Sequence, residues 1–178
     1  VLLYAYAEWG PECLQKIEGM FAFAIYDSIQ STIFLARDFA GQKPLYYSLK
    51  DGSLLFASEL KSIIALDPNL KSLNYPAALS YFHNGFIPND SSIISSIKKL
   101  PPAHALFFDL KTRDYTILDF HNLAKTINSK YNKQVLPVPE KIVLEMEKLL
   151  NKSVQQQLIA DVPIGVLLSG GLDSSLVT

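Results

Sequence analysis

Residues 163–178 read PIGVLLSGGLDSSLVT, and this stretch decides the fold predicted for the C-terminal part of the chain. The apolar run from Ile164 to Leu168 has the length and content of a strand buried on both faces, as in a parallel sheet. The glycine turn at residues 169–171 lets a ligand approach the backbone without hindrance from a Cβ atom. Residues 173–175, Asp-Ser-Ser, are followed by two apolar residues and are typical of the start of a helix.

A strand, a glycine turn and a helix start, in this order, form a cradle for an anion. The backbone amides of the turn and the positive end of the helix dipole suit a phosphate group, and serine hydroxyls add donors. The carboxylate of Asp173 could hold a magnesium ion against the phosphate oxygens. We therefore predict a phosphate-binding loop with Asp173 as its magnesium ligand.

Other loop signatures fit this stretch less well. The Walker loop requires a lysine that is absent after Gly171, and the dinucleotide fingerprint requires a different glycine spacing. The nucleophile elbow G-x-S-x-G is half matched around Ser169, because Leu167 stands at its first glycine position. This elbow, and a tight turn that binds no ligand, remain as alternatives.

The segment Ser169–Ser175 resembles the pyrophosphate-binding loop of the N-type ATP pyrophosphatases. Together with residues 160–168, ADVPIGVLL, it resembles glutamine-hydrolysing asparagine synthetases. The resemblance implies ATP and magnesium as cofactors, and a substrate carboxylate that attacks the α-phosphate to give an acyl-adenylate. It also implies that the pyrophosphate of ATP is bound by Leu168, Ser169, Gly170, Gly171, Leu172, Asp173, Ser174 and Ser175.

The composition is that of a globular protein, with 49% hydrophobic and 19% charged residues among 178. A formal net charge of -1 gives no electrostatic footprint for nucleic acid. No apolar run reaches the roughly 18 residues of a membrane span, and the N-terminus has no secretory pattern. We therefore expect a soluble, cytoplasmic protein with neither nucleic acid nor membrane as a partner. The resemblance implies glutamine, aspartate and ATP as small-molecule substrates.

The chain has one cysteine, Cys13, which cannot form an internal disulfide. Apolar residues recur around it at helical spacing and predict a single N-terminal helix that ends near Gly19. The residues of this stripe are Leu3, Tyr6, Trp9, Cys13, Leu14 and Ile17. We expect Cys13 to be a buried thiol rather than a nucleophile, because free cysteine is among the most buried residue types.

Four short runs rich in apolar and aromatic residues predict an antiparallel sheet, with Asp51-Gly52 as one of its turns. They are residues 20–26, 32–36, 45–48 and 54–57. Two helices are expected next, one capped by Ser58 and ending near residue 65, and one opened by Asn74 and running through residue 82. Residues 105–109 and 115–119 then predict a hairpin.

A polar cluster formed by residues 37–38 and 41–44 could bind a ligand or form a solvated turn. We predict the solvated turn, because loops at sheet ends are polar by default. His83, His104 and His121 have no partner at metal-ligand spacing, and we expect His104 at the surface or at the start of a strand.

Several collinear segments resemble the later part of class II glutamine amidotransferase domains. They are residues 19–24, 34–38, 41–47, 56–59, 84–88 and 97–104. Two residues depart from the family pattern. Phe39 replaces the usual arginine, so any ion pair of that arginine is absent or replaced. Ala103 replaces the usual glycine, so we expect the loop to be locally adjusted if that position requires a positive φ.

A polar stretch with prolines at its end, residues 121–138, is the predicted linker. A helix is expected from about Glu140, with an apolar face that we interpret as ordinary packing. The residues of this face are Ile142, Met146, Leu149, Leu150, Val154 and Leu158.

The predicted fold has two parts. By resemblance, residues 1–120 are the C-terminal part of a glutaminase domain, an α+β antiparallel layered sheet that is Ntn-hydrolase-like and partial. Residues 139–178 are the start of an α/β parallel-sheet ATP pyrophosphatase domain.

The resemblance implies part of a carbon–nitrogen ligase of asparagine biosynthesis. Such an enzyme makes asparagine from aspartate, ATP and glutamine through β-aspartyl-AMP, and releases AMP and pyrophosphate. The family nucleophile is an N-terminal cysteine, expected before Val1, so no catalytic residue is assigned in this chain. We expect a homodimer for the full-length protein and no activity for residues 1–178 alone. A related amidotransferase of surface-sugar or secondary-metabolite synthesis that adenylates another carboxylate, or a non-catalytic scaffold, remains as an alternative.

Overall fold

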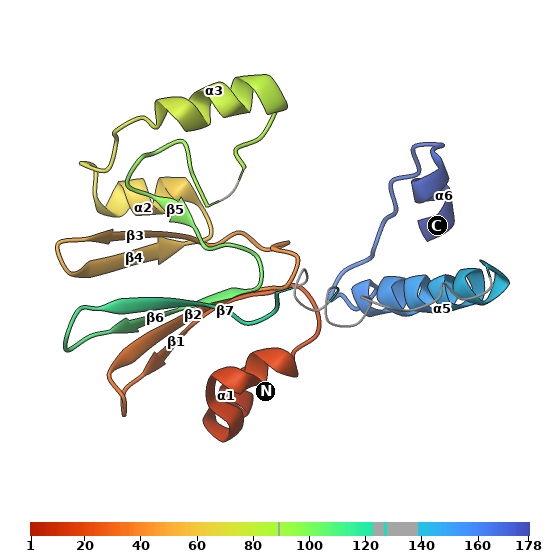
Figure 1. Cartoon of the computed structure of the whole chain (residues 1–178), viewed down its shortest axis with the longest axis horizontal. Coiled ribbons are helices and arrows are strands. Elements are labelled where there is room, and N and C mark those ends of the chain that lie inside the picture. Colours follow the sequence, from red (N-terminus) through yellow and green to blue (C-terminus); the bar gives the residue numbers. More distant parts are fainter. Residues whose placement is uncertain (89, 123–126, 128–138) are drawn as a thin grey trace. The chain divides into compact units, whose positions relative to one another are not determined.

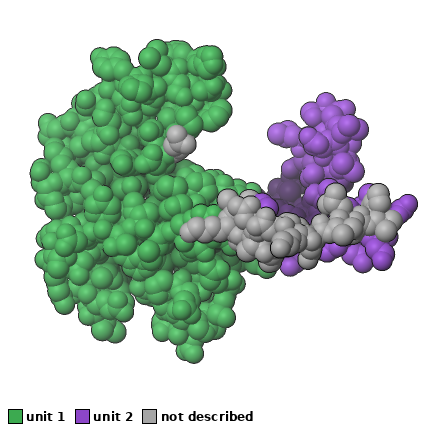
Figure 2. Space-filling view, in the orientation of Figure 1, with its two compact units in different colours: residues 1–124 green, residues 125–178 purple. Residues whose placement is uncertain are grey.

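A computed structural model describes residues 1–178 except residues 89, 123–126 and 128–138. The chain divides into two compact units, Val1–Ala124 and Lys125–Thr178 (Figures 1 and 2). Most of the predicted linker, residues 121–138, lies outside the described residues.

Unit 1 contains two antiparallel sheets (Figure 1). The first has the order β1-β2-β6-β7, formed by Ala22–Asp27, Thr32–Arg37, His104–Asp109 and Tyr115–Asp119. The second has the order β4-β3-β5, formed by Ser53–Ala57, Tyr46–Lys50 and Lys98–Lys99. The prediction that the first four strands share one sheet is therefore wrong, whereas both predicted hairpins are present. Hairpin pairing is local, but sheet membership depends on which residues cover each face.

Three apolar clusters separate the layers of unit 1. One lies between the N-terminal helices and the outer face of the first sheet, and contains Cys13, Phe34 and Ala105. A second lies between the two sheets and contains Leu35, Tyr47 and Leu106, among others. A third lies between the second sheet and α2, and contains Ile63, Leu70 and Ile97. The order of layers is therefore helix, sheet, sheet, helix.

The N-terminal region is two short helices rather than the single helix predicted. The α-helix α1 spans Leu2–Trp9, and the 3-10 helix η1 spans Gly10–Gln15. Pro11 has no N–H to donate, so the α-helical ladder stops there and the predicted stripe is broken. Leu3 and Trp9 are exposed, because α1 packs Leu2, Ala5 and Tyr6 against the core instead, whereas Cys13 is fully buried as predicted.

The two helices beside the second sheet are α2, Leu60–Leu66, and α3, Tyr75–Asn84. Asn74 caps α3 as predicted, with its side-chain oxygen accepting a hydrogen bond from the amide of Ala77 at 3.2 Å. The predicted cap at Ser58 is wrong, because α2 begins after Glu59 and no side chain caps it.

Ala103 keeps a left-handed backbone, with φ of 57°, so the expected local adjustment of its loop does not occur. Two backbone hydrogen bonds hold this conformation, from the amide of Ala103 to the carbonyl of Asp38 and from the amide of Phe120 to the carbonyl of Ala103. An alanine in this region costs about 1–2 kcal/mol relative to glycine. His104 begins β6, as expected.

The position usually held by arginine, Phe39, makes an aromatic contact instead of an ion pair. Its ring meets the ring of His121 edge to face, with centroids 4.6 Å apart. Through this contact His121, at the start of the predicted linker, packs against the turn that follows β2.

In unit 2, the helix α5 spans Pro139–Gln157, close to its predicted start, and α6 spans Leu172–Val177. The predicted strand at residues 164–168 is wrong for the structure, because this segment pairs with no described strand. A strand forms only when a neighbour satisfies its backbone groups. The apolar face of α5 is likewise not packed as predicted, since Met146, Leu149 and Leu150 are exposed.

No helix among the described residues is long and apolar enough to cross a membrane.

We expect Cys13→Ser to lower the free energy of unfolding by about 1–3 kcal/mol, because it places a hydroxyl in an apolar cluster without a partner. Burial also raises the pKa of the Cys13 thiol, which keeps it protonated. Urea denaturation is the measurement. Cys13→Ala is the control, and it should cost less because it adds no polar group; an equal or smaller cost for serine would contradict the prediction.

Stability should also fall at high pH because of Tyr47. Burial raises the pKa of this phenol from 10.0 to about 12 in the folded protein. Between these values the unfolded chain releases a proton that the folded chain keeps, so stability is lost as the pH rises from 10 towards 12. Tyr47→Phe should flatten this part of the curve of unfolding free energy against pH; an unchanged curve would show that other groups control it.

Candidate functional site

Residues 168–175 form an extended segment, a tight turn and the first turn of α6. Gly170 has a φ of 78°, a conformation that favours glycine. Gly171 is the N-cap of α6 and has an extended backbone, with φ of -80° and ψ of 163°. The predicted turn and helix start are therefore present, although the strand before them is not.

The serine hydroxyls of the loop converge on one another. The hydroxyls of Ser169 and Ser174 lie 3.0 Å apart. Ser174 also donates to the carbonyl of Gly171 at 3.0 Å, and Ser175 donates to the same carbonyl at 2.8 Å. A Cβ atom at Gly171 would lie 3.5 Å from the Ser169 hydroxyl and 3.9 Å from that of Ser174. These are ordinary van der Waals distances, so a Cβ atom at Gly171 would lie beside both hydroxyls without a clash.

Asp173 lies in the first turn of α6, and no described residue forms a hydrogen bond or ion pair with its carboxylate. Among the described residues no group of three or more His, Cys, Asp or Glu side chains could hold a metal ion. A magnesium ion here would therefore need phosphate oxygens and water as its other ligands, which is the usual mode for this ion. The side chains of Leu168 and Leu172 have no hydrogen-bond donor, so only the backbone amides of these residues could contact an anion.

The nucleophile elbow is not supported by this geometry. The polar partner of the Ser169 hydroxyl is another hydroxyl, that of Ser174, rather than a general base. An activated serine needs a base within hydrogen-bonding distance. The loop is thus better suited to bind an anion than to attack a carbonyl group.

The solvated turn predicted after β2 is confirmed in part: Gln42, Lys43 and Pro44 are exposed, but Asp38 is only 1% exposed. Its carboxylate accepts hydrogen bonds from the amides of Phe21, Gln42 and Lys43. These bonds close the turn and join it to Phe21, the residue immediately before β1. Sequence reasoning missed this role; the signal was an aspartate three residues before a glycine, a common turn pattern.

Two family models match the chain in succession. The model described as a glutamine amidotransferase domain matches residues 1–119, which is more than half of the chain. The chain therefore belongs to the glutamine amidotransferase domain family. A second model, described as asparagine synthase, matches residues 145–178 and so includes the phosphate-loop candidate.

Curated relatives carry names of the same kind. The chain is 38% identical to a Methanocaldococcus jannaschii protein provisionally named as a glutamine-hydrolyzing asparagine synthetase, over 99% of this chain and 33% of that protein. It is 36% identical to asparagine synthetase [glutamine-hydrolyzing] 3 of Bacillus subtilis, over 100% of this chain and 28% of that protein. It is 32% identical to asparagine synthetase B of Escherichia coli, over 100% of this chain and 26% of that protein. The resemblance found in the sequence is confirmed, and the chain spans a third or less of these relatives.

We expect Asp38→Asn to lower the free energy of unfolding by about 2–3 kcal/mol, because an amide group cannot accept from three amides with the strength of a carboxylate. Thermal and urea unfolding measure the loss. Asp27→Asn is the matched control, since Asp27 accepts amide hydrogen bonds from Ile29 and Gln30 in an exposed turn and should lose about 1 kcal/mol or less. Similar losses for the two variants would contradict the assigned role of Asp38.

Proposed function

We propose that this chain is part of an ATP-dependent, glutamine-hydrolysing amidotransferase that makes asparagine from aspartate. The observation that carries the proposal is the succession of the two family matches, with the converging serine hydroxyls inside the second. The names of the relatives support the same reaction. In this reaction glutamine would supply ammonia, and ATP would activate the carboxylate of aspartate as an adenylate.

Each of the two regions would carry out one part of this reaction. We assign residues 1–120 to the glutaminase domain and residues 139–178 to the start of an ATP pyrophosphatase domain, with residues 121–138 as linker. The order helix, sheet, sheet, helix in unit 1 supports an Ntn-hydrolase-like fold for the first region. Nucleophilic attack on glutamine is assigned to no residue of this chain, because Cys13 is buried and its raised pKa disfavours the thiolate.

The loop at residues 168–175 would hold the pyrophosphate part of ATP. The amides of Gly170, Gly171 and Leu172 and the hydroxyls of the three loop serines are the proposed donors, and Asp173 is the proposed magnesium ligand. Bound ATP would supply the phosphorus atom that the substrate carboxylate attacks, with pyrophosphate as the leaving group. The protein would orient this group and offset its negative charge.

The present hydrogen bonds of the loop imply a small rearrangement on binding. A hydroxyl has one proton, and those of Ser174 and Ser175 are now donated to the carbonyl of Gly171. Each hydroxyl must rotate away from this carbonyl before it can donate to a phosphate oxygen. The loop would thus exchange internal hydrogen bonds for charge-assisted ones, which are stronger.

We further propose that the full-length protein is a cytoplasmic homodimer that acts on glutamine, aspartate and ATP.

In the full-length enzyme, Asp173→Asn should reduce ATP–pyrophosphate exchange by about 100-fold or more, because the amide no longer neutralises or orients the metal ion. Glutamine hydrolysis should remain measurable in the same preparation. Asp161→Asn is the control, since Asp161 is an exposed carboxylate before the loop and should leave exchange within about twofold. Unchanged exchange in Asp173→Asn would refute the assignment of the loop.

A further inference from the structure

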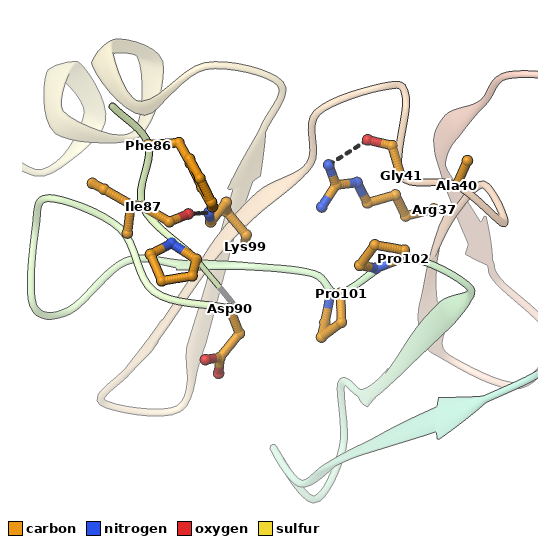
Figure 3. A pocket seen from close by; sticks show the side chains of 10 residues that line it. Arg37, Ala40, Gly41, Phe86, Ile87, Asp90, Lys99, Pro101 and Pro102 are labelled. Carbon is orange, nitrogen blue, oxygen red and sulfur yellow. Dashed lines mark hydrogen bonds between the residues drawn. The ribbon is translucent and has the colours of Figure 1, made fainter. Parts of the chain in front are cut away.

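A cavity of about 770 Å³ lies within unit 1, between the turn after β2, residues 86–88, Asp90 and the segment around residues 99–102 (Figure 3). Its volume is in the range of pockets that hold small molecules. None of its lining residues belongs to the loop at residues 168–175. Two of them, Arg37 and Lys99, are cationic.

The guanidinium group of Arg37 is held in place by backbone carbonyls. It donates to Lys43 at 2.8 Å, to Leu100 at 2.7 Å and to Gly41 at 2.6 Å. These bonds use three of the five N–H groups of an arginine and leave two for a ligand. They also fix the side chain before a ligand arrives, so little side-chain entropy is lost on binding. Carbonyls do not neutralise the charge, and none of the ion pairs between described residues includes Arg37.

Gly41 lets this guanidinium lie close to the turn. A Cβ atom at Gly41 would lie 2.8 Å from the ring of Pro102 and 3.1 Å from the Cζ atom of Arg37. The backbone here also has a φ of 66°, which disfavours any other residue. The turn thus keeps the guanidinium group of Arg37 in the wall of the pocket. In Figure 3 the guanidinium points across the pocket towards Lys99 and Phe86.

Lys99 supplies a second positive charge. Its ammonium group donates to the carbonyl of Ile87 at 2.5 Å and has two further N–H groups. Burial, and then the positive charge of Arg37, lower the pKa of Lys99 from its ordinary value. A nearby anion would reverse the second effect, because opposite charge favours the charged form of lysine.

The remaining walls are mostly apolar and include Phe86, Ile87, Pro101 and Pro102. Phe86 is 61% exposed, so its ring is accessible to a ligand. The acidic residue of the lining, Asp90, is 3.6 Å from Lys98 and points away from Arg37 and Lys99 in Figure 3. The carboxylate of Asp90 therefore does not lie between the two cations, although its negative charge still acts on Lys99 and opposes the lowering of the pKa of that lysine by burial and by Arg37.

We propose that this pocket binds a small organic anion, with its carboxylate or phosphate group on Arg37 and Lys99 and its apolar part against Phe86 and the prolines. Binding in this pocket requires both the anionic group and the apolar part of the ligand. The fixed cations bind the charged group, and the apolar walls favour an organic anion over an inorganic one.

The test is a titration of the isotope-labelled protein with phenyl phosphate, benzoate and inorganic phosphate, followed by NMR. The amide of Gly41 and the Nε–H of Arg37 report on this pocket, whereas the amides of Gly170 and Gly171 report on the phosphate-loop candidate. We expect phenyl phosphate or benzoate to shift the first pair of signals, and inorganic phosphate to bind there at least tenfold more weakly than phenyl phosphate. The headgroup that binds more tightly identifies the class of ligand.

Lys99→Gln should weaken binding at least tenfold. Lys71→Gln is the matched control, because it removes the same charge from an exposed lysine that neither lines the pocket nor pairs with Asp90, and it should change the affinity by less than twofold. Phe86→Ala removes an exposed ring, so it tests the proposal even if Lys99→Gln does not fold. This variant should lose the preference for phenyl phosphate over inorganic phosphate. Equal weakening by the two lysine variants, shifts at Gly170 and Gly171 alone, or no binding at 10 mM ligand would each overturn the proposal.

Discussion

The arrangement of unit 1 depends on the burial of β2 on both faces. Phe34 and Ala36 point into the cluster beneath the N-terminal helices, and Leu35 points into the cluster between the sheets. All three are fully buried. A strand with only one buried face needs one covering layer, but β2 needs a helix layer on one side and a second sheet on the other. The aromatic contact of Phe34 with Tyr6, with centroids 5.1 Å apart, joins the helix layer to the sheet, and the contact of Phe34 with Phe107, at 4.7 Å, joins β2 to β6 within the sheet.

The polar groups that follow β2 depend on this burial as well. Because β2 is fixed, Asp38 after its end is buried and Arg37 at its end is partly buried, so their charges must be satisfied. Backbone groups satisfy both, since carbonyls accept from Arg37 and amides donate to Asp38. The two side chains do not form a salt bridge with each other, although burial lowers the pKa of Arg37 and the nearby negative charge of Asp38 opposes this shift. Two N–H groups of Arg37 remain available to the pocket.

Unit 2 shows the opposite balance between local and tertiary interactions. Its glycine turn and the helix after it form from hydrogen bonds that reach at most five residues, such as those of Ser174 with Ser169 and Gly171. The apolar segment before the turn is exposed, with Leu167 at 95%. A phosphate-binding turn can therefore be shaped locally, whereas the strand that precedes it requires neighbouring strands.

The sequence by itself determined the local elements of this protein. The hairpins, the Asn74 cap, the glycine turn with its helix start and the burial of Cys13 follow from turn chemistry and short-range periodicity, which depend on nearby residues. Only the tertiary structure decided that the first four strands divide between two sheets, that Ala103 accepts a left-handed backbone and that Lys99 shares a cavity with Arg37. These features join residues distant in the sequence, and their free energy comes from the burial of shared surfaces, which no local pattern specifies.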